Sequence, residues 1–158
     1  MSYFRKLTLE TTRLAQMFGR EDKWLIVINA DPDALASAMA LRRIMVHRVA
    51  AVGIAHVNEV KRPDNLAMMR FLRIPTQPLT DELRVRYDHF AMVDSQPHHH
   101  PGFKACQFSI VIDHHPIKPD SPVTASFVDI RPDYGSVSTI LTEYLYNMDI
   151  RPGKLLAT

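Results

Sequence analysis

The 158-residue sequence contains a single cysteine, Cys106, and only five glycines. One cysteine excludes an internal disulfide and a cluster of thiolate ligands, so a bound metal would need carboxylate and imidazole ligands. No apolar run approaches the about 20 residues that a membrane-spanning helix requires. Residues 1–22 also lack the uninterrupted apolar core of a secretory signal. These absences predict a cytoplasmic protein without a membrane partner.

The charges are nearly balanced, which excludes another class of protein. Nineteen Lys and Arg face seventeen Asp and Glu, giving a net charge of +2 at pH 7. General attraction to nucleic acid needs clustered Lys and Arg rather than a near balance, although a local basic patch stays open. The length and the 46% hydrophobic content fit one well-buried core, so we expect one domain over residues 1–158.

Apolar residues alternate between two patterns along the chain. Continuous apolar runs predict buried strands at 24–28, 51–55, 89–93 and 108–112, with a further strand within 123–130. Helical spacing predicts helices over 4–18, 34–49 and 64–72, and a last helix that starts near residue 136. This alternation predicts an α/β fold, with a mainly parallel sheet flanked by helices.

Acidic residues follow three of the predicted strands directly. They are Asp31 and Asp33 after 24–28, Asp94 after 89–93, and Asp113, followed by His114 and His115, at the end of 108–112. Ligands of an open parallel sheet bind outside the carboxyl ends of its strands, so we expect these side chains to share one site. Neighbouring ionised carboxylates repel one another, and such a site requires a cation or raised pKa values.

The types of ligand indicate the metal and the chemistry. Carboxylates and imidazoles without thiolates suit Mn, Mg or Fe better than a structural zinc site. Two such metals would clamp a phosphoryl oxygen, acidify a bound water and stabilise an in-line displacement. The pattern therefore predicts hydrolysis of a phosphate ester.

Three segments resemble the first three motifs of the DHH phosphoesterases. They are residues 29–37 (NADPDALAS), 93–95 (VDS) and 111–116 (VIDHHP). Residues 129–145 (DIRPDYGSVSTILTEYL) are similar to the loop and helix that follow in members related to nanoRNases and bacterial cyclic-dinucleotide phosphodiesterases. The resemblance extends from about residue 25 to 145, in the family's order. It implies a DHH-type catalytic domain that hydrolyses a phosphodiester or phosphomonoester of short oligonucleotides or nucleotides.

The resemblance also implies a set of metal ligands. Asp31 would bind a first metal and Asp33 a second, and Asp94 would bridge the two. His114 would be a further ligand of the second metal. The implied cofactor is Mn, with Mg or another divalent metal as the alternative. The implied partner is a nucleotide or a short single-stranded oligonucleotide.

Further residues would act on the substrate. The resemblance implies that His115 contacts the scissile phosphate and that Asp113 orients the histidine pair without touching the metal. Ser37 would lie in the first turn of the helix after Asp33, where free backbone N–H groups favour phosphate. Ser136, at the start of the last predicted helix, is a second candidate for binding phosphate.

Two features depart from the family pattern. Family members usually place a histidine four residues before the first aspartate, where this sequence has Val27; the nearest polar residue is Asn29. The family also supplies a later metal-binding aspartate and a second domain, whereas this sequence stops at Thr158. We expect the N-terminal part of a longer two-domain protein or a naturally reduced member. The alternative function is a catalytically disabled domain that binds a nucleotide or a partner for regulation.

Simpler explanations exist for the same residues. Residues 31–33 fit a turn followed by a helix cap, Asp94 fits a second cap, and residues 113–115 fit a surface loop. Their joint position after three buried strands favours a common site. Side chains of consecutive residues point in different directions, so we expect residues 98–100, three histidines, in a solvated loop. The sequence leaves the oligomeric state open, a homodimer included.

Overall fold

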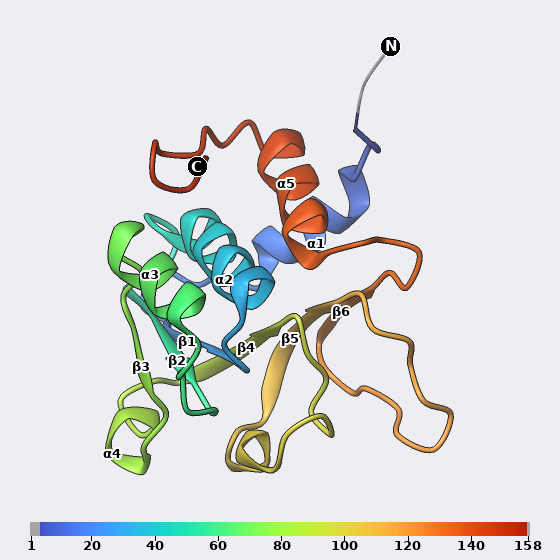
Figure 1. Ribbon diagram of the computed structural model, residues 1–158. Coiled ribbons are helices and arrows are strands. Elements are labelled where there is room, and N and C mark those ends of the chain that lie inside the picture. Colours follow the sequence, from blue (N-terminus) through green and yellow to red (C-terminus); the bar gives the residue numbers. More distant parts are fainter. Residues whose placement is uncertain (1–3, 158) are drawn as a thin grey trace.

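The computed structural model describes residues 4–157 and contains a six-stranded, all-parallel sheet (Figure 1). Residues 1–3, which belong to the N-terminal stretch considered above, and residue 158 lie outside the described part. The strands are β1 (Lys23–Ile28), β2 (Ala51–His56), β3 (Thr76–Pro78), β4 (His89–Val93), β5 (Phe108–Asp113) and β6 (Phe127–Ile130). Their order in the sheet is β3-β2-β1-β4-β5-β6. The predicted α/β fold is confirmed.

Helices cover the two faces of the sheet unequally. They are α1 (Thr8–Gln16), α2 (Pro32–Met45), α3 (Pro63–Phe71), α4 (Asp81–Arg84), α5 (Val137–Asn147) and the short 3-10 helix η1 (Pro101–Ala105). In Figure 1, α1, α2, α3 and α5 lie above the sheet and α4 lies below it. None of the helices in residues 4–157 combines the length and apolarity that crossing a membrane requires.

Alternate residues of the central strands enter two separate cores. On β1, Trp24, Ile26 and Ile28 pack in the core that contains residues of α1, α2 and α5. Leu25 and Val27 pack in the other core, against residues of α4 and η1. Since both faces of the strand are buried from residue 24 to 28, all five of these positions are apolar, which explains the continuous apolar run.

Most differences from the predicted elements concern short segments. The helix predicted over 34–49 starts at Pro32, with Asp31 as its N-cap, and ends at Met45. The strand expected within 123–130 is only Phe127–Ile130. The sequence pattern missed β3, α4 and η1, because elements of three to five residues show no period.

The strand order reverses between β1 and β4, which are neighbours in the sheet. The chain leaves β1 toward β2 and β3 and later returns to build β4, β5 and β6 on the other side. In open α/β sheets the carboxyl edge at such a reversal is where ligands bind. The acidic residues at or just after the ends of β1, β4 and β5 lie at this edge.

Candidate metal centre

Four aspartates converge at the carboxyl edge of the sheet. Burial, followed by the negative charges of Asp33, Asp31 and Asp113, raises the pKa of Asp94 to about 9. Charge effects of this kind require short separations. The structure therefore brings together the ends of β1, β4 and β5, as the strand-end pattern predicts.

Asp94 occupies an unfavourable position in the absence of a cation. Asp94 is only 8% exposed, and its Oδ1 has no hydrogen-bond partner among the described residues. His114 Nε2 lies 3.5 Å from this oxygen. The backbone of Asp94 has a φ of 58°, a left-handed conformation that costs about 1–2 kcal/mol in a residue with a side chain. A divalent cation would supply the missing partner, so these residues fit a metal.

Asp31 and Asp33 both bind the starts of helices. Asp31 Oδ1 accepts the N–H of Ala34 at 2.9 Å and caps α2, as expected if residues 31–33 form a turn and a helix cap. The two oxygens of Asp33 accept the N–H groups of Val137 at 2.8 Å and Ser138 at 2.9 Å, the first two residues of α5. A carboxylate has about four acceptor positions, so capping leaves both side chains able to bind a cation as well.

The backbone of a distant loop fixes the orientation of His114. Its Nδ1 lies 2.9 Å from the carbonyl oxygen of Tyr134. A carbonyl only accepts, so Nδ1 carries the proton and Nε2 keeps its lone pair, which is the state that binds a metal. Ligand atoms of Asp94, His114 and His115 all lie within 4.8 Å of one another. The Nε2 atom of His114 therefore lies beside Asp94 with a lone pair that could bind a metal.

Asp113 is fully buried and holds His115 in place. His115 Nδ1 lies 2.8 Å from Asp113 Oδ1, and the side-chain amide of Gln96 donates to Asp113 Oδ2 at 2.8 Å. The same amide donates to the backbone carbonyl of His115 at 2.9 Å. The resemblance implied that Asp113 orients both histidines; in the structure it contacts His115, whereas a backbone carbonyl orients His114. Sequence reasoning missed Gln96.

A buried ionic network holds the loop before α5. Arg131 makes paired hydrogen bonds to Asp129 at 2.8 and 2.6 Å and a third to Glu143 at 2.7 Å. The hydroxyl of Tyr134 contacts Glu143, and that of Tyr144 donates to Asp129 at 2.6 Å. Burial is the largest single influence on the pKa of Arg131 and lowers it, but the hydrogen bonds and the charge of Asp129, together with Tyr134 and Tyr144, outweigh burial and raise the pKa. The network thus positions the carbonyl that orients His114.

The two candidate phosphate-binding serines lie in different surroundings. Ser37 is the sixth residue of α2, so it lies in the second turn and not in the first, because the helix already starts at Pro32. It is also fully buried. Ser136 is the N-cap of α5, where its hydroxyl accepts the N–H of Thr139 at 3.2 Å. The neighbouring free N–H groups of α5 bind Asp33 instead of an external anion.

Val27 lies within the core below the sheet and is fully buried. Its side chain packs with those of Leu25 and Met92, so this position offers no ligand to the carboxylate cluster. Asn29 follows the end of β1 and is exposed. The histidine that the family usually provides near the first aspartate has no replacement at position 27.

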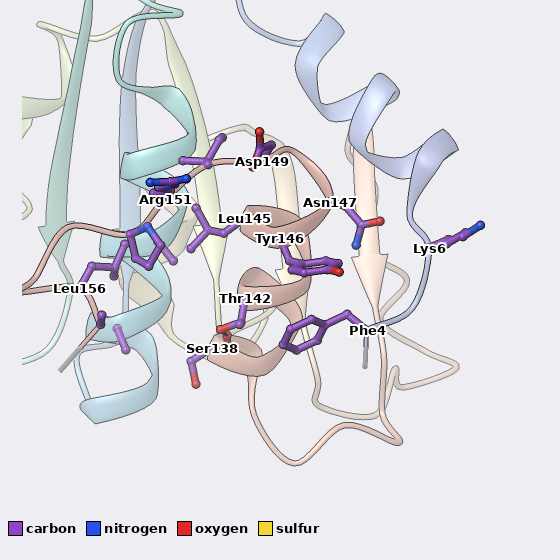
Figure 2. Close-up of a pocket in the computed structure, with 15 residues that line it drawn as sticks. Phe4, Lys6, Ser138, Thr142, Leu145, Tyr146, Asn147, Asp149, Arg151 and Leu156 are labelled. Atoms are coloured by element: carbon purple, nitrogen blue, oxygen red, sulfur yellow. Dashed lines mark hydrogen bonds between the residues drawn. The ribbon is translucent and has the colours of Figure 1, made fainter. Parts of the chain in front are cut away.

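A cavity of about 1010 Å³ lies elsewhere, between the N-terminal segment, α5 and the C-terminal segment (Figure 2). Phe4, Tyr146, Leu145 and Arg151 are among the residues that line it. None of the four clustered aspartates does so. The acidic cluster is thus distinct from this largely apolar hollow.

Comparison with known proteins gives one family match and a similar relative. Residues 23–157 match the model of the DHH family, N-terminal domain, whose members are generally metal-dependent phosphoesterases. The chain is also 34% identical over 131 residues to the uncharacterized protein MJ1633 of Methanocaldococcus jannaschii. That match covers 83% of this chain and 27% of the relative, so the chain spans about a quarter of the relative's length.

Proposed function

The chain belongs to the DHH family, and from this premise we propose that it is a divalent-metal-dependent phosphoesterase for short single-stranded oligonucleotides or nucleotides. It hydrolyses a phosphodiester or a phosphomonoester, as in the nanoRNase and cyclic-dinucleotide phosphodiesterase branch that residues 129–145 resemble. The observation that carries the proposal is the buried Asp94 carboxylate. Its unpartnered oxygen and its pKa of about 9, beside three further aspartates, call for a cation.

Four side chains hold the metal in this proposal. Asp31, Asp33, Asp94 and His114 supply oxygen and imidazole ligands, a set that suits Mn, with Mg as the alternative. When bound, the metal acidifies a water and stabilises charge on the phosphoryl group. Capping of α2 and α5 fixes the first two carboxylates before any metal arrives. The hydrogen bond of His114 Nδ1 leaves a lone pair on Nε2, which lies 3.5 Å from Asp94 Oδ1.

His115 binds the scissile phosphate in this proposal. Its side chain is 45% exposed, while its buried partner Asp113 is not exposed at all. Asp113 Oδ1 accepts a hydrogen bond from Nδ1–H and so fixes the orientation of the ring. In the protonated ring the opposite nitrogen, Nε2, carries an N–H that can donate to an anionic phosphate oxygen. Ser37 does not bind phosphate in this proposal, because its hydroxyl is buried.

The experiment is hydrolysis of a 5′-phosphorylated RNA dinucleotide with and without Mn²⁺, together with the melting temperature under the same conditions. We expect Mn²⁺-dependent turnover and a rise in melting temperature, because a ligand of the native state stabilises it by mass action. Asp94→Asn should abolish the turnover and most of the thermal shift. Asp149→Asn is the matched control, since Asp149 is an exposed aspartate that also has a left-handed φ, of 52°.

Equal thermal shifts in the wild type and Asp94→Asn, with no hydrolysis by either, would refute the phosphoesterase. That outcome would leave the alternative of a domain that binds a nucleotide or a partner for regulation. Turnover by Asp94→Asn at the wild-type rate would refute the metal site while leaving the activity itself in place.

A further inference from the structure

Three consecutive histidines in the loop between β4 and η1 differ in their surroundings. His98 is exposed, as expected for a solvated loop. His100 accepts the N–H of Gly102 on Nδ1 at 3.0 Å and thereby caps η1. His99 is also exposed, but its ring lies 5.2 Å from the ring of His115, at an angle of 83°. Only the middle histidine therefore contacts the site described above.

Hydrogen bonds to the loop fix the tautomer of His99. Its Nδ1 lies 3.1 Å from the backbone N of Gln96 and 3.3 Å from the hydroxyl of Ser95. A backbone N–H can only donate, so Nδ1 must accept and the proton of the neutral ring is on Nε2. His99 thus carries one N–H donor whose direction is set by the loop.

Gln96 orients the rings of both His99 and His115. Gln96 donates its backbone N–H to His99, while its side-chain amide donates to Asp113 and to the carbonyl of His115. Gln96 is fully buried, so this connection is shielded from water. The rings of His99 and His115 are therefore held at a fixed separation, on the accessible side of the site.

Ligand atoms of His99, Asp113 and His115 all lie within 4.8 Å of one another, which raises the question of a second metal. The hydrogen bonds argue against one. The free nitrogen of His99 carries a proton and not a lone pair, and Asp113 is fully buried and accepts a hydrogen bond from Gln96. A group with a fixed N–H beside the phosphate-binding histidine fits an anion better than a cation.

We propose that His99 Nε2–H donates to a non-bridging oxygen of the phosphate that His115 contacts. This inference rests on the proposed function and extends it by one binding residue. The two imidazoles would approach the phosphate from the β4–η1 loop and from the end of β5. A donor with a fixed direction recognises a phosphate oxygen without rearranging when the substrate arrives.

The test is the affinity for inorganic phosphate of the Mn²⁺-saturated protein, measured by titration calorimetry. In His99→Asn the side-chain oxygen takes the place of Nδ1 and keeps the contact to Gln96, but the Nε2–H donor is lost. We expect phosphate to bind about 10- to 100-fold more weakly, the loss typical of one hydrogen bond to a charged group. The affinity for Mn²⁺ should stay unchanged. His98→Asn, the same change at the neighbouring residue, should bind phosphate like the wild type.

A second variant separates binding from support of the loop. In His99→Gln the amide N–H₂ can replace the Nε2–H donor, but the acceptor for the N–H of Gln96 is lost. We expect this variant to recover part of the phosphate affinity and to melt at a lower temperature. Equal losses of phosphate affinity in both variants would assign the effect to the loop and overturn the proposal.

Three further outcomes are decisive. Wild-type phosphate affinity in His99→Asn, or no phosphate binding by the Mn²⁺-loaded wild type, would also overturn the role of His99. Phosphate binding that depends on His99 without hydrolysis of the RNA dinucleotide would support this inference and refute the proposed phosphoesterase activity. The two failures are therefore distinguishable.

Discussion

Asp94 combines three features: the residue is buried, its backbone has a left-handed φ, and one of its carboxylate oxygens has no hydrogen-bond partner among the described residues. Each feature destabilises the folded protein when no cation is present. They occur together at the residue that the proposed function places between the metals. At this position the fold gives up stability and gains a site prepared for positive charge.

The pH dependence of stability tests the state of Asp94. Its pKa of about 9 in the folded protein lies above the about 3.9 of an unfolded aspartate. Between these values the folded protein keeps a proton that the unfolded chain loses, so the free energy of unfolding falls as the pH rises from about 4 to 9. Asp94→Asn cannot ionise, and asparagine tolerates the left-handed φ. We expect the metal-free variant to be more stable by about 1–3 kcal/mol at pH 8.

Urea unfolding with EDTA at pH 5 and pH 8 would measure this effect. The stability difference between Asp94→Asn and the wild type should grow toward pH 8. A difference that is the same at both values, or of opposite sign, would mean that Asp94 ionises in the folded protein as an ordinary aspartate does.

The sequence predicted a common position for the acidic residues because each lies at or just after the end of a buried strand. It did not reveal Gln96, His99 or the carbonyl of Tyr134, which hold or border the histidines. These contacts join neighbouring loops of the chain, and no pattern of hydrophobicity or spacing encodes them. Hydrogen bonds of this kind become visible only when the strands are placed next to one another.

At the scale of elements, Asp33 connects the start of α2 with the start of α5. Its two hydrogen bonds span more than one hundred residues of sequence and lie at the positive end of the α5 dipole. The arrangement couples the loop after β1 to the loop after β6. The sequence predicted the two helices but not the bond between them, because an acidic residue after a strand fits a cap, a ligand and an inter-helix contact equally well.

Asp33→Asn should therefore lower the free energy of unfolding of the metal-free protein. The amide has one acceptor oxygen and no charge, so one hydrogen bond and the favourable dipole interaction are lost. We expect a decrease of about 1–2 kcal/mol in the free energy of unfolding, measured in urea with EDTA. Asp31→Asn is the control, because asparagine caps a helix as well as aspartate does. Equal effects of the two substitutions would show that the contact to α5 contributes nothing.

The ionic network between β6 and α5 predicts a larger effect. Arg131→Met leaves Asp129 and Glu143 charged and buried without their partner, which we expect to cost about 3–5 kcal/mol in urea unfolding. Arg62→Met removes a similar paired contact to Asp64, which is exposed. Exposed pairs contribute little, so that variant should unfold as the wild type does. An equally small effect at Arg131 would show that the network does not hold the loop.

For the whole molecule, the sequence predicted the fold class but not the arrangement of the strands. Continuous apolar runs indicate strands buried on both faces, and helices between them indicate parallel pairing. All central strands share this pattern, however, so nothing in the sequence says that β4 pairs with β1 rather than with β3. The reversal of strand order between β1 and β4 places the two strands side by side, and with it brings Asp31 and Asp33 to Asp94, more than sixty residues later in the chain.

This topology predicts where a metal protects the backbone. The proposed ligands come from the ends of β1, β4 and β5, and Asp33 links them to the start of α5. Saturating Mn²⁺ should therefore slow amide hydrogen exchange in peptides from these four places, because a bound ligand stabilises the segments that hold it. Exchange in β3 and in residues 149–157, beside the cavity of Figure 2, should not change. Asp94→Asn should lose the protection at all four places together, since one bridging residue joins them. Protection of residues 149–157 instead would place the metal at the cavity and separate it from the strand ends.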